Sequence, residues 1–372
     1  MNTSPTAPLY LTRFIAAYLV LILHYIPQSI MNAYPLIHLF GEPVNYFFFL
    51  SGFVMIVSNK KCIDFETKRI NLDRKDFWIR RFARIYPMYI LALLFTVLFH
   101  YTVREIDPSV SKKIWLESIG VNRWFLPASI NYPDWSVSCE FLFYLLFPFA
   151  LIWVVKKSWQ NLTVIVLSLF LLNILFAIVY WHMTPRLLSL NDSSVYKSLV
   201  QAIYLHPISK FSIFLFGCLS GRLYLSNSGM TIMRKYSPLI LVASLLGILF
   251  ASWFIGLEHR YIIDAGILCL LYFPFVLAIC SLKGVTLKAL SWRPFLFLGE
   301  ISYGIYIMQA PVAYYFRHFF TDEKDFTLGQ FLLYSLSLIL ICSALYYVYE
   351  GPAKKIIASG KLKYRLVRFD VR

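Results

Sequence analysis

The stretch LYLTRFIAAYLVLILHYIP, residues 9–27, is long and apolar enough to cross a membrane as a helix. Further apolar runs lie at 44–58, 83–100, 135–155, 161–181, 207–225, 237–256, 261–281, 297–317 and 328–349. The run at 44–58 is short, but its aromatic sequence, VNYFFFLSGFVMIVS, favours a span. The sequence therefore predicts an all-α integral membrane protein, a bundle of about ten transmembrane helices.

Composition supports this class of protein. Of the 372 residues, 59% are hydrophobic and 15% are charged, whereas about a quarter of the residues in soluble domains are charged. Such a composition excludes an ordinary soluble enzyme and an intrinsically disordered chain. A net charge of +16 would indicate nucleic-acid binding in a soluble protein. Membrane proteins instead concentrate basic residues in cytoplasmic loops, so no nucleic-acid partner is expected.

The basic residues also predict the orientation. If the N-terminus is cytoplasmic, 24 Lys and Arg residues fall in or next to the cytoplasmic segments and 10 on the opposite side. This asymmetry favours ten helices with both termini cytoplasmic, in the plasma membrane (the inner membrane of a bacterium). Because Met1–Thr12 holds no Lys or Arg, the first run is expected to be a retained helix rather than a signal peptide.

We expect one transmembrane domain over residues 1–372, with a basic cytoplasmic tail at 355–372. The chain contains six cysteines, and none has the spacing of a metal site or a disulfide framework. The cysteines are interpreted as small packing residues, and no metal is expected.

Arg13 and His24 are ionisable residues within the first run. Eleven residues at 100° each return the second side chain to within about 20° of the first, about 16 Å further along the helix. Both residues therefore lie on one face, and charged groups inside a span usually mark function. The alternative is that Arg13 reaches the inner headgroups while His24 caps a hydrated interface.

Glu140 lies in the run PDWSVSCEFLFYLLFPF, residues 133–149. Asp134 is a candidate N-cap and Trp135 suits the outer headgroup belt. Helical rise places Glu140 about 7–8 Å below that edge and His24 about 10 Å below it. The two side chains are thus predicted to meet, and a carboxylate would orient the imidazole as a general base. The alternative is a structural polar pair between two helices.

Arginines precede the third run in RRFARIYP, residues 80–87. Arg81 and Arg84 share a helical face, and guanidinium groups suit phosphates. The alternative partner is the headgroup of an anionic lipid.

Ser51 and Gly52 form a small pair that permits close helix approach. Ser302 belongs to a polar stripe that either lines a cavity or bonds to neighbouring helices.

In order along the chain stand Arg-x10-His, FFFLSGF at 47–53, RRFARIYP, WSVSCEFLFYLLFP at 135–148, SYGIY at 302–306 and YEGP at 349–352. In these motifs the chain resembles the acyltransferase-3 family of membrane-bound O-acyltransferases for surface glycans. It is similar to the stand-alone form, without a fused periplasmic esterase-like domain. One departure is Gln309, where the family often has a histidine that can accept a proton.

The resemblance implies transfer of an acyl group from cytoplasmic acetyl-CoA to a hydroxyl of a surface or lipid-linked glycan. On this basis Arg80, Arg81 and Arg84 are expected to bind the phosphates of the donor, and Arg13 to guide its pantetheine arm. His24, oriented by Glu140, would take the proton of the acceptor, by direct transfer or through an acyl-histidine. Candidates for substrate or oxyanion contacts are Ser51, Trp135, Ser302 and Tyr303.

Two other classes of protein remain open from the sequence. Intramembrane Arg, His and Glu also suit a transporter or flippase for a glycolipid or sugar. Transporters often carry inverted repeats, and the halves of this chain show no convincing similarity. A non-catalytic sensor or scaffold would not need His24 and Glu140 at matching depth. Consumption of thioester that depends on acceptor separates an enzyme from both.

Overall fold

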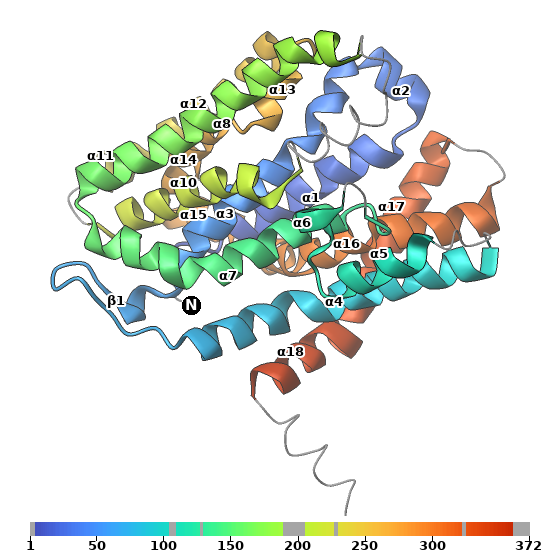
Figure 1. The fold of residues 1–372 in the computed structure, drawn as a ribbon, viewed down its shortest axis with the longest axis horizontal. Helices are drawn as coiled ribbons and strands as arrows, with labels where there is room; N and C mark the ends of the chain where they lie inside the picture. Colours follow the sequence, from blue (N-terminus) through green and yellow to red (C-terminus); the bar gives the residue numbers. More distant parts are fainter. Residues whose placement is uncertain are drawn as a thin grey trace, which may run out of the picture.

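The computed structural model describes residues 4–103, 109–126, 129–188, 205–226, 230–321 and 325–359. Within these ranges the chain is almost entirely helical (Figure 1). The only sheet there is a two-stranded antiparallel hairpin of β1 (Ile63–Asp64) and β2 (Arg69–Ile70). The predicted all-α fold is confirmed. The remaining residues, which include most of the predicted basic tail at 355–372, lie outside the described part of the chain.

The helices occur in the following order: α1 (Leu9–Tyr25), α2 (Gln28–Ala33), η1 (Pro35–Gly41), α3 (Pro43–Ser58), η2 (Lys60–Cys62), α4 (Arg74–Val103), α5 (Ser109–Ser118), α6 (Asn122–Phe125), α7 (Asp134–Lys156), α8 (Trp159–Leu188), α10 (Pro207–Leu225), α11 (Thr231–Lys235), α12 (Ser237–Ile255), α13 (Arg260–Asp264), α14 (Cys269–Ile279), α15 (Gly284–Leu290), α16 (Arg293–Phe320), α17 (Leu328–Leu345), η4 (Tyr346–Glu350) and α18 (Gly351–Ala358).

Eight helical segments of the described residues are long and apolar enough to cross a membrane, or nine if the bent pair α14–α15 is one span. The helix α1, with 17 residues, is slightly shorter. Nine of the ten predicted runs coincide with a long helix or with α1. The chain is therefore a multi-pass membrane protein by length and composition of its helices.

The run predicted at 261–281 is not a single helix, and this prediction is wrong. The chain forms α13, a turn and α14, and α15 then bends away from α14 by 112°. Gly266 breaks the helix, since its φ of +97° is rarely adopted by other residues. A Cβ atom there would lie 2.6 Å from Cδ1 of Ile213 on α10. Hydropathy detects an apolar run but not a glycine that turns the backbone.

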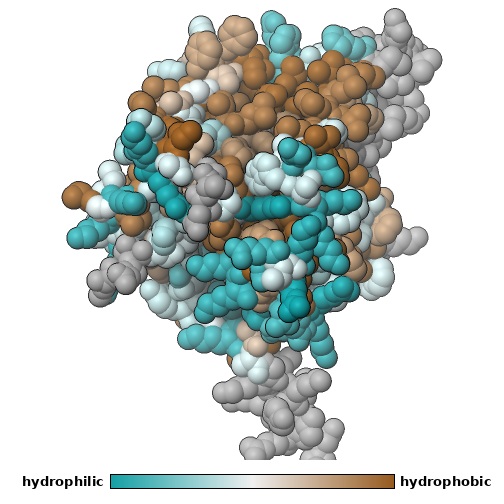
Figure 2. Space-filling model, turned by 90° about the vertical axis from the view of Figure 1, so that its left-hand side faces the viewer, coloured by the Kyte–Doolittle hydropathy of each residue, from teal (hydrophilic) through white to brown (hydrophobic). Residues whose placement is uncertain are grey.

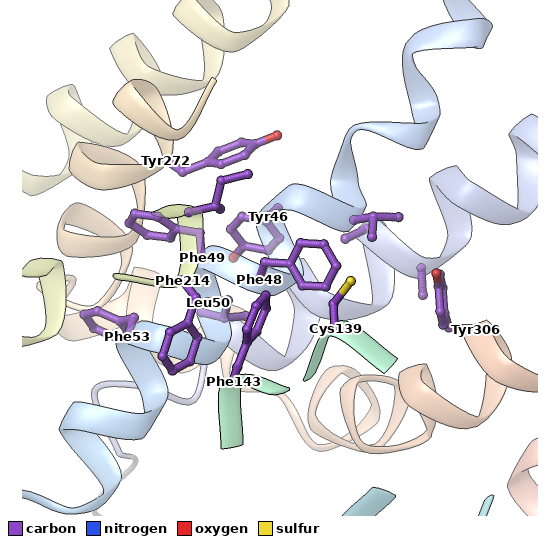
Figure 3. Packing of buried hydrophobic residues seen from close by; sticks show 14 of the residues in the cluster. Tyr46, Phe48, Phe49, Leu50, Phe53, Cys139, Phe143, Phe214, Tyr272 and Tyr306 are labelled. Atoms are coloured by element: carbon purple, nitrogen blue, oxygen red, sulfur yellow. The ribbon is translucent and has the colours of Figure 1, made fainter. Parts of the chain in front are cut away.

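Glycines bring α3 and α10 into backbone contact. A Cβ atom on Gly52 would lie 2.0 Å from the carbonyl oxygen of Phe214, and one on Gly217 would lie 1.9 Å from that of Phe49. Such close approach is typical of membrane helices with small residues at their interface. The close packing predicted at Ser51–Gly52 is confirmed for Gly52. Phenylalanines of α3, α7 and α10 surround the crossing (Figure 3), and the rings of Phe143 and Phe214 stack at 5.0 Å.

The helix α1 packs against both α16 and α3. A Cβ atom on Gly299 of α16 would lie 2.3 Å from the carbonyl oxygen of Tyr10, so this contact is also close. Because α1 is enclosed in this way, its polar side chains face other helices rather than lipid. The β1–β2 hairpin lies at one end of the bundle, the left of Figure 1, and α2 and α5 lie toward the other. Figure 2 looks onto the hairpin end, where hydrophilic side chains cover much of the lower half.

Candidate active site

A cavity of about 220 Å³ lies between α1, α3, α4, α7 and α16, and we call it the arginine cavity. Each of these helices contributes at least one residue that the sequence singled out. Its lining includes Arg13, Ser51, Arg81, Arg84, Glu140, Ser302 and Tyr303. Residues separated by almost 300 positions in sequence thus meet in one place.

Positive charge predominates in the arginine cavity. Arg81 donates a hydrogen bond from Nη2 to the hydroxyl oxygen of Ser58 over 3.2 Å, and its guanidinium lies 5.5 Å from the ring centre of Phe77. Its Nε is buried without a hydrogen-bond partner. Within the described residues, Arg13 and Arg84 form neither an ion pair nor a hydrogen bond through their side chains. Guanidinium groups with unused donors suit a phosphate or carboxylate ligand.

Glu140 is the only carboxylate among the described residues that line this cavity. Its Oε2 accepts a hydrogen bond of 3.0 Å from the hydroxyl of Tyr144, one helical turn further on. Its charged neighbours are Arg13, Arg84 and Arg81. The single carboxylate therefore offsets part of the charge of three arginines.

His24 lines a second cavity of about 130 Å³, which we call the histidine cavity. Its imidazole meets the ring of Tyr132 edge-on, with centroids 4.9 Å apart and an interplanar angle of 81°. Burial raises the pKa of Tyr132, a loop residue, so its phenol stays protonated. Val44 and Tyr306 line both cavities. The two cavities are therefore neighbours, separated by shared side chains.

His24 and Glu140 are not brought together, and the predicted pairing is wrong. They line different cavities, and no hydrogen bond connects them in the described structure. Trp135, five residues before Glu140, lines the histidine cavity instead, with its ring 5.9 Å from that of Phe48. The prediction assumed that the helices are parallel and start at one level. Because Glu140 follows Trp135 by five residues, it lies about 7.5 Å further along α7 than the residue that does line the cavity of His24.

Arg80 is not part of the arginine cavity. Its guanidinium forms an ion pair with Asp76 on the same helix, and both side chains are about half exposed. Arg81 and Arg84, three residues apart on α4, line the cavity, whereas the side chain of Arg80 turns toward Asp76, one helical turn before it. The expected phosphate contact of Arg80 is therefore not supported by its position.

Two of the candidate oxyanion donors are already engaged. The hydroxyl of Ser302 donates to the carbonyl of Gly299 over 2.7 Å, and that of Tyr303 donates to the carbonyl of Ile85 over 3.1 Å. Both residues line the arginine cavity rather than the histidine cavity, as does Ser51. The three hydroxyl groups therefore lie in the cavity of the arginines and not in the cavity of His24.

Three ionisable residues of the histidine cavity were missed by the sequence reasoning. Arg260 Nε lies 3.4 Å from Asp264 Oδ2, and Lys210 Nζ donates to the backbone carbonyl of Asp264 over 2.5 Å. Asn45 Nδ2 donates to the same carbonyl over 3.1 Å. Lys210 and Asp264 each lie within a predicted apolar run, so the rule that singled out Arg13 would have found them. In the described part of the chain no group of three or more His, Cys, Asp or Glu side chains is placed to hold a metal.

In a comparison with known protein families, the sequence of this chain matches one family model. A model described as an acyltransferase domain matches residues 9–347. The peptidoglycan O-acetyltransferase OatA of Listeria monocytogenes is 26% identical over 298 residues, which cover 72% of this chain and 44% of that protein. The O-acetyltransferase OatA of Staphylococcus aureus is 23% identical over 344 residues, 84% of this chain and 52% of that protein. The acyltransferase MdmB of Streptomyces mycarofaciens is 34% identical over 114 residues, 28% of this chain and 27% of that protein. The chain spans about half the length of the two O-acetyltransferases, and no solved structure matches it.

Proposed function

The chain belongs to the acyltransferase-3 family, whose model matches residues 9–347, and from this premise we propose that it is a membrane-bound O-acetyltransferase. It would move an acetyl group from cytoplasmic acetyl-CoA to a hydroxyl of a cell-surface or lipid-linked glycan. Two of the three relatives named above are O-acetyltransferases by name, one of them for peptidoglycan, and the third is named an acyltransferase. The observation that carries the proposal is that a cavity lined by three arginines adjoins the cavity that holds His24.

The arginine cavity suits the donor. Coenzyme A carries phosphates, and Arg13, Arg81 and Arg84 present guanidinium groups that form paired, charge-assisted hydrogen bonds with such groups. Arg81 and Arg84 stand near the first turns of α4, at the hairpin end of the bundle predicted to be cytoplasmic. We assign the phosphates to these two arginines and the beginning of the pantetheine arm to Arg13.

The distance between the cavities suits the length of the donor. Arg13 and His24 lie on one face of α1, about 16 Å apart along its axis. This separation is comparable to the reach of an extended pantetheine arm. The arm would pass Val44 and Tyr306, which line both cavities, and bring the thioester to His24.

His24 would act as the general base. A neutral imidazole nitrogen takes the proton of the acceptor hydroxyl as its oxygen bonds to the thioester carbonyl carbon. The carbon–sulfur bond then breaks, and the proton passes from His24 to the leaving thiolate. The products are the acetylated glycan and free coenzyme A, so atoms and charges balance. Trp135 and Tyr132 line the same cavity as His24 and provide aromatic faces for a sugar ring.

The test is transfer of labelled acetyl from acetyl-CoA to an acceptor glycan by the purified full-length chain. His24→Ala should lower the rate by about 100-fold or more, the usual contribution of a general base, with normal membrane insertion. His182→Ala is the matched control, because His182 is exposed on α8 and lines neither cavity. Wild-type rates for His24→Ala would overturn the mechanism. Movement of glycolipid without consumption of thioester would identify a transporter instead.

A further inference from the structure

A second basic site lies at the hairpin end of the molecule, outside both cavities. The hairpin and the C-terminal half of α7 enclose a groove of about 600 Å³, which we call the basic groove. Its cations are Lys68, Arg69, Arg74 and Lys156, all exposed, and no described carboxylate lines it. It shares no lining residue with the arginine cavity. The residues that line the groove therefore carry a net positive charge, and none of them belongs to the arginine cavity.

The floor of the basic groove is apolar and continues onto the outer face of α7. Pro148 and Ile152 line the groove. Next to them, Leu145, Phe149 and Trp153 are 45%, 47% and 55% exposed. Residues four apart form one stripe on a helix, and an exposed apolar stripe on a membrane-spanning helix faces lipid chains. The guanidinium of Arg74 lies 5.1 Å from the ring centre of Phe149, so groove and stripe meet there.

The hairpin is fixed in position on α7. Arg222 of α10 donates from Nη1 to the carbonyl of Val154 over 2.7 Å, and its guanidinium lies 5.5 Å from the ring of Phe65 and 5.6 Å from that of Trp159. Asp64, the cross-strand partner of Arg69, offsets part of the charge of that residue, and its side chain accepts hydrogen bonds from the backbone and hydroxyl of Thr67 within the turn. The groove is therefore formed without a ligand.

We propose that the basic groove binds one anionic glycerophospholipid of the leaflet at the hairpin end. Its headgroup phosphate would lie against Arg69, Arg74 and Lys156, and an acyl chain would follow the stripe of Leu145, Phe149 and Trp153. Basic side chains at a membrane surface attract anionic headgroups. A soluble phosphate would leave the apolar floor and the stripe without a partner, whereas a phospholipid occupies both. Since Arg74 is the first residue of α4, the bound lipid would also anchor the helix that carries Arg81 and Arg84.

The test compares binding of phosphatidylglycerol and phosphatidylcholine to the purified full-length chain by native mass spectrometry. The wild type should retain phosphatidylglycerol about ten-fold more strongly, and the double variant Arg69→Gln/Arg74→Gln should lose this preference. Lys60→Gln/Lys61→Gln removes the same charge from exposed positions outside the groove and should retain it. If both double variants lost the preference for phosphatidylglycerol equally, the lipid would be attracted by the overall charge of this surface, and the proposed site would be wrong.

Two further arms test the nature of the ligand. Phe149→Ala should weaken retention of phosphatidylglycerol although all four cations remain, because it removes part of the apolar stripe that would contact the acyl chain of the lipid. Glycerol phosphate, which carries the charge without acyl chains, should not displace the lipid at equal concentration. Displacement by glycerol phosphate, or no effect of Phe149→Ala, would show a site for a soluble anion. Because Arg69, Arg74 and Phe149 are exposed, the variants are expected to fold, and thermal unfolding in phosphatidylcholine checks this.

Discussion

Arg80 and Arg81 are neighbours in sequence with opposite surroundings. Arg81 lines the arginine cavity, while Arg80 pairs with Asp76 on the outer face of α4. Loss of a charge-assisted hydrogen bond costs about 1.5–3 kcal/mol. Arg81→Ala should therefore raise the KM for acetyl-CoA by about ten-fold or more, and Arg80→Ala by less than about two-fold. Steady-state kinetics with varied donor decide this, and equal effects of the two substitutions would remove Arg81 from the donor site.

Glu140 has a different role from the one its sequence position predicted. It stands among arginines and not beside His24. Glu140→Gln removes the carboxylate within the cavity and leaves only the nearby Glu350 to oppose the arginines, so these should separate and the KM for acetyl-CoA should rise several-fold. The pH dependence of kcat should stay in place, because the imidazole keeps its neighbours. If the pH dependence of kcat shifted and the KM for acetyl-CoA did not change, the result would support the predicted pairing of Glu140 with His24.

At the residue scale the sequence singled out side chains that line the two cavities, but it did not predict which of them meet. Ionisable residues inside apolar runs are costly, so Arg13, His24 and Glu140 could be singled out without a structure. Their partners depend on the tilt and depth of each helix, which packing decides. Lys210 of α10 and Arg260 and Asp264 of α13 line the cavity of His24, although they are far from it in sequence.

The crossing of α3 and α10 depends on a glycine. A methyl group at Gly217 would overlap the backbone of Phe49, which cannot move without displacing α3. Gly217→Ala should lower the free energy of unfolding by about 1–3 kcal/mol or prevent folding. Gly329→Ala is the matched control, since nothing lies within 4 Å of a Cβ atom there. Thermal unfolding in detergent measures both, and equal stability of the two variants would contradict this packing.

The connection from α5 to α7 predicts a dependence of stability on pH. Glu117 is fully buried and accepts hydrogen bonds from the backbone N–H groups of Ile130 (2.7 Å) and Asn131 (3.0 Å). Burial raises the pKa of Glu117 from 4.5 to about 7. Because the folded state binds this proton more tightly, the stabilisation is full below pH 4.5 and is lost as the pH rises through about 7.

Glu117→Gln keeps the shape of the side chain and removes the titration. The melting temperature of the wild type should fall between about pH 5 and about pH 8, and that of the variant should fall less. Parallel curves for the two proteins would assign the pH dependence to another group.

At the element scale, hydropathy predicted where helices lie but not where they break. The hydropathy of residues 261–281 predicts one span, but Gly266 divides this run, and Asp264 on its first part lines the histidine cavity. The contact between α3 and α10 was visible only as a small pair at Ser51–Gly52. Its partner, Gly217, could not be assigned, because nothing in one sequence pairs two helices.

At the scale of the whole molecule, the two neighbouring cavities lie toward opposite ends of the bundle. The arginine cavity lies toward the hairpin, and the histidine cavity is lined by Tyr132, Arg260 and Asp264 of the connections at the other end. The positive-inside rule predicts the hairpin end to be cytoplasmic. Donor and acceptor would therefore approach from opposite sides of the membrane.

The most direct test uses inverted membrane vesicles, with the cytoplasmic face outward, labelled acetyl-CoA added outside and acceptor glycan trapped inside. A membrane-impermeant thiol reagent checks the orientation, since Cys62 beside the hairpin is partly exposed and the other five cysteines are buried. We predict label on the trapped glycan with the wild type and none with His24→Ala. Label only on glycan supplied outside with the donor, or equal labelling of the trapped glycan by His24→Ala, would contradict transfer through the two cavities.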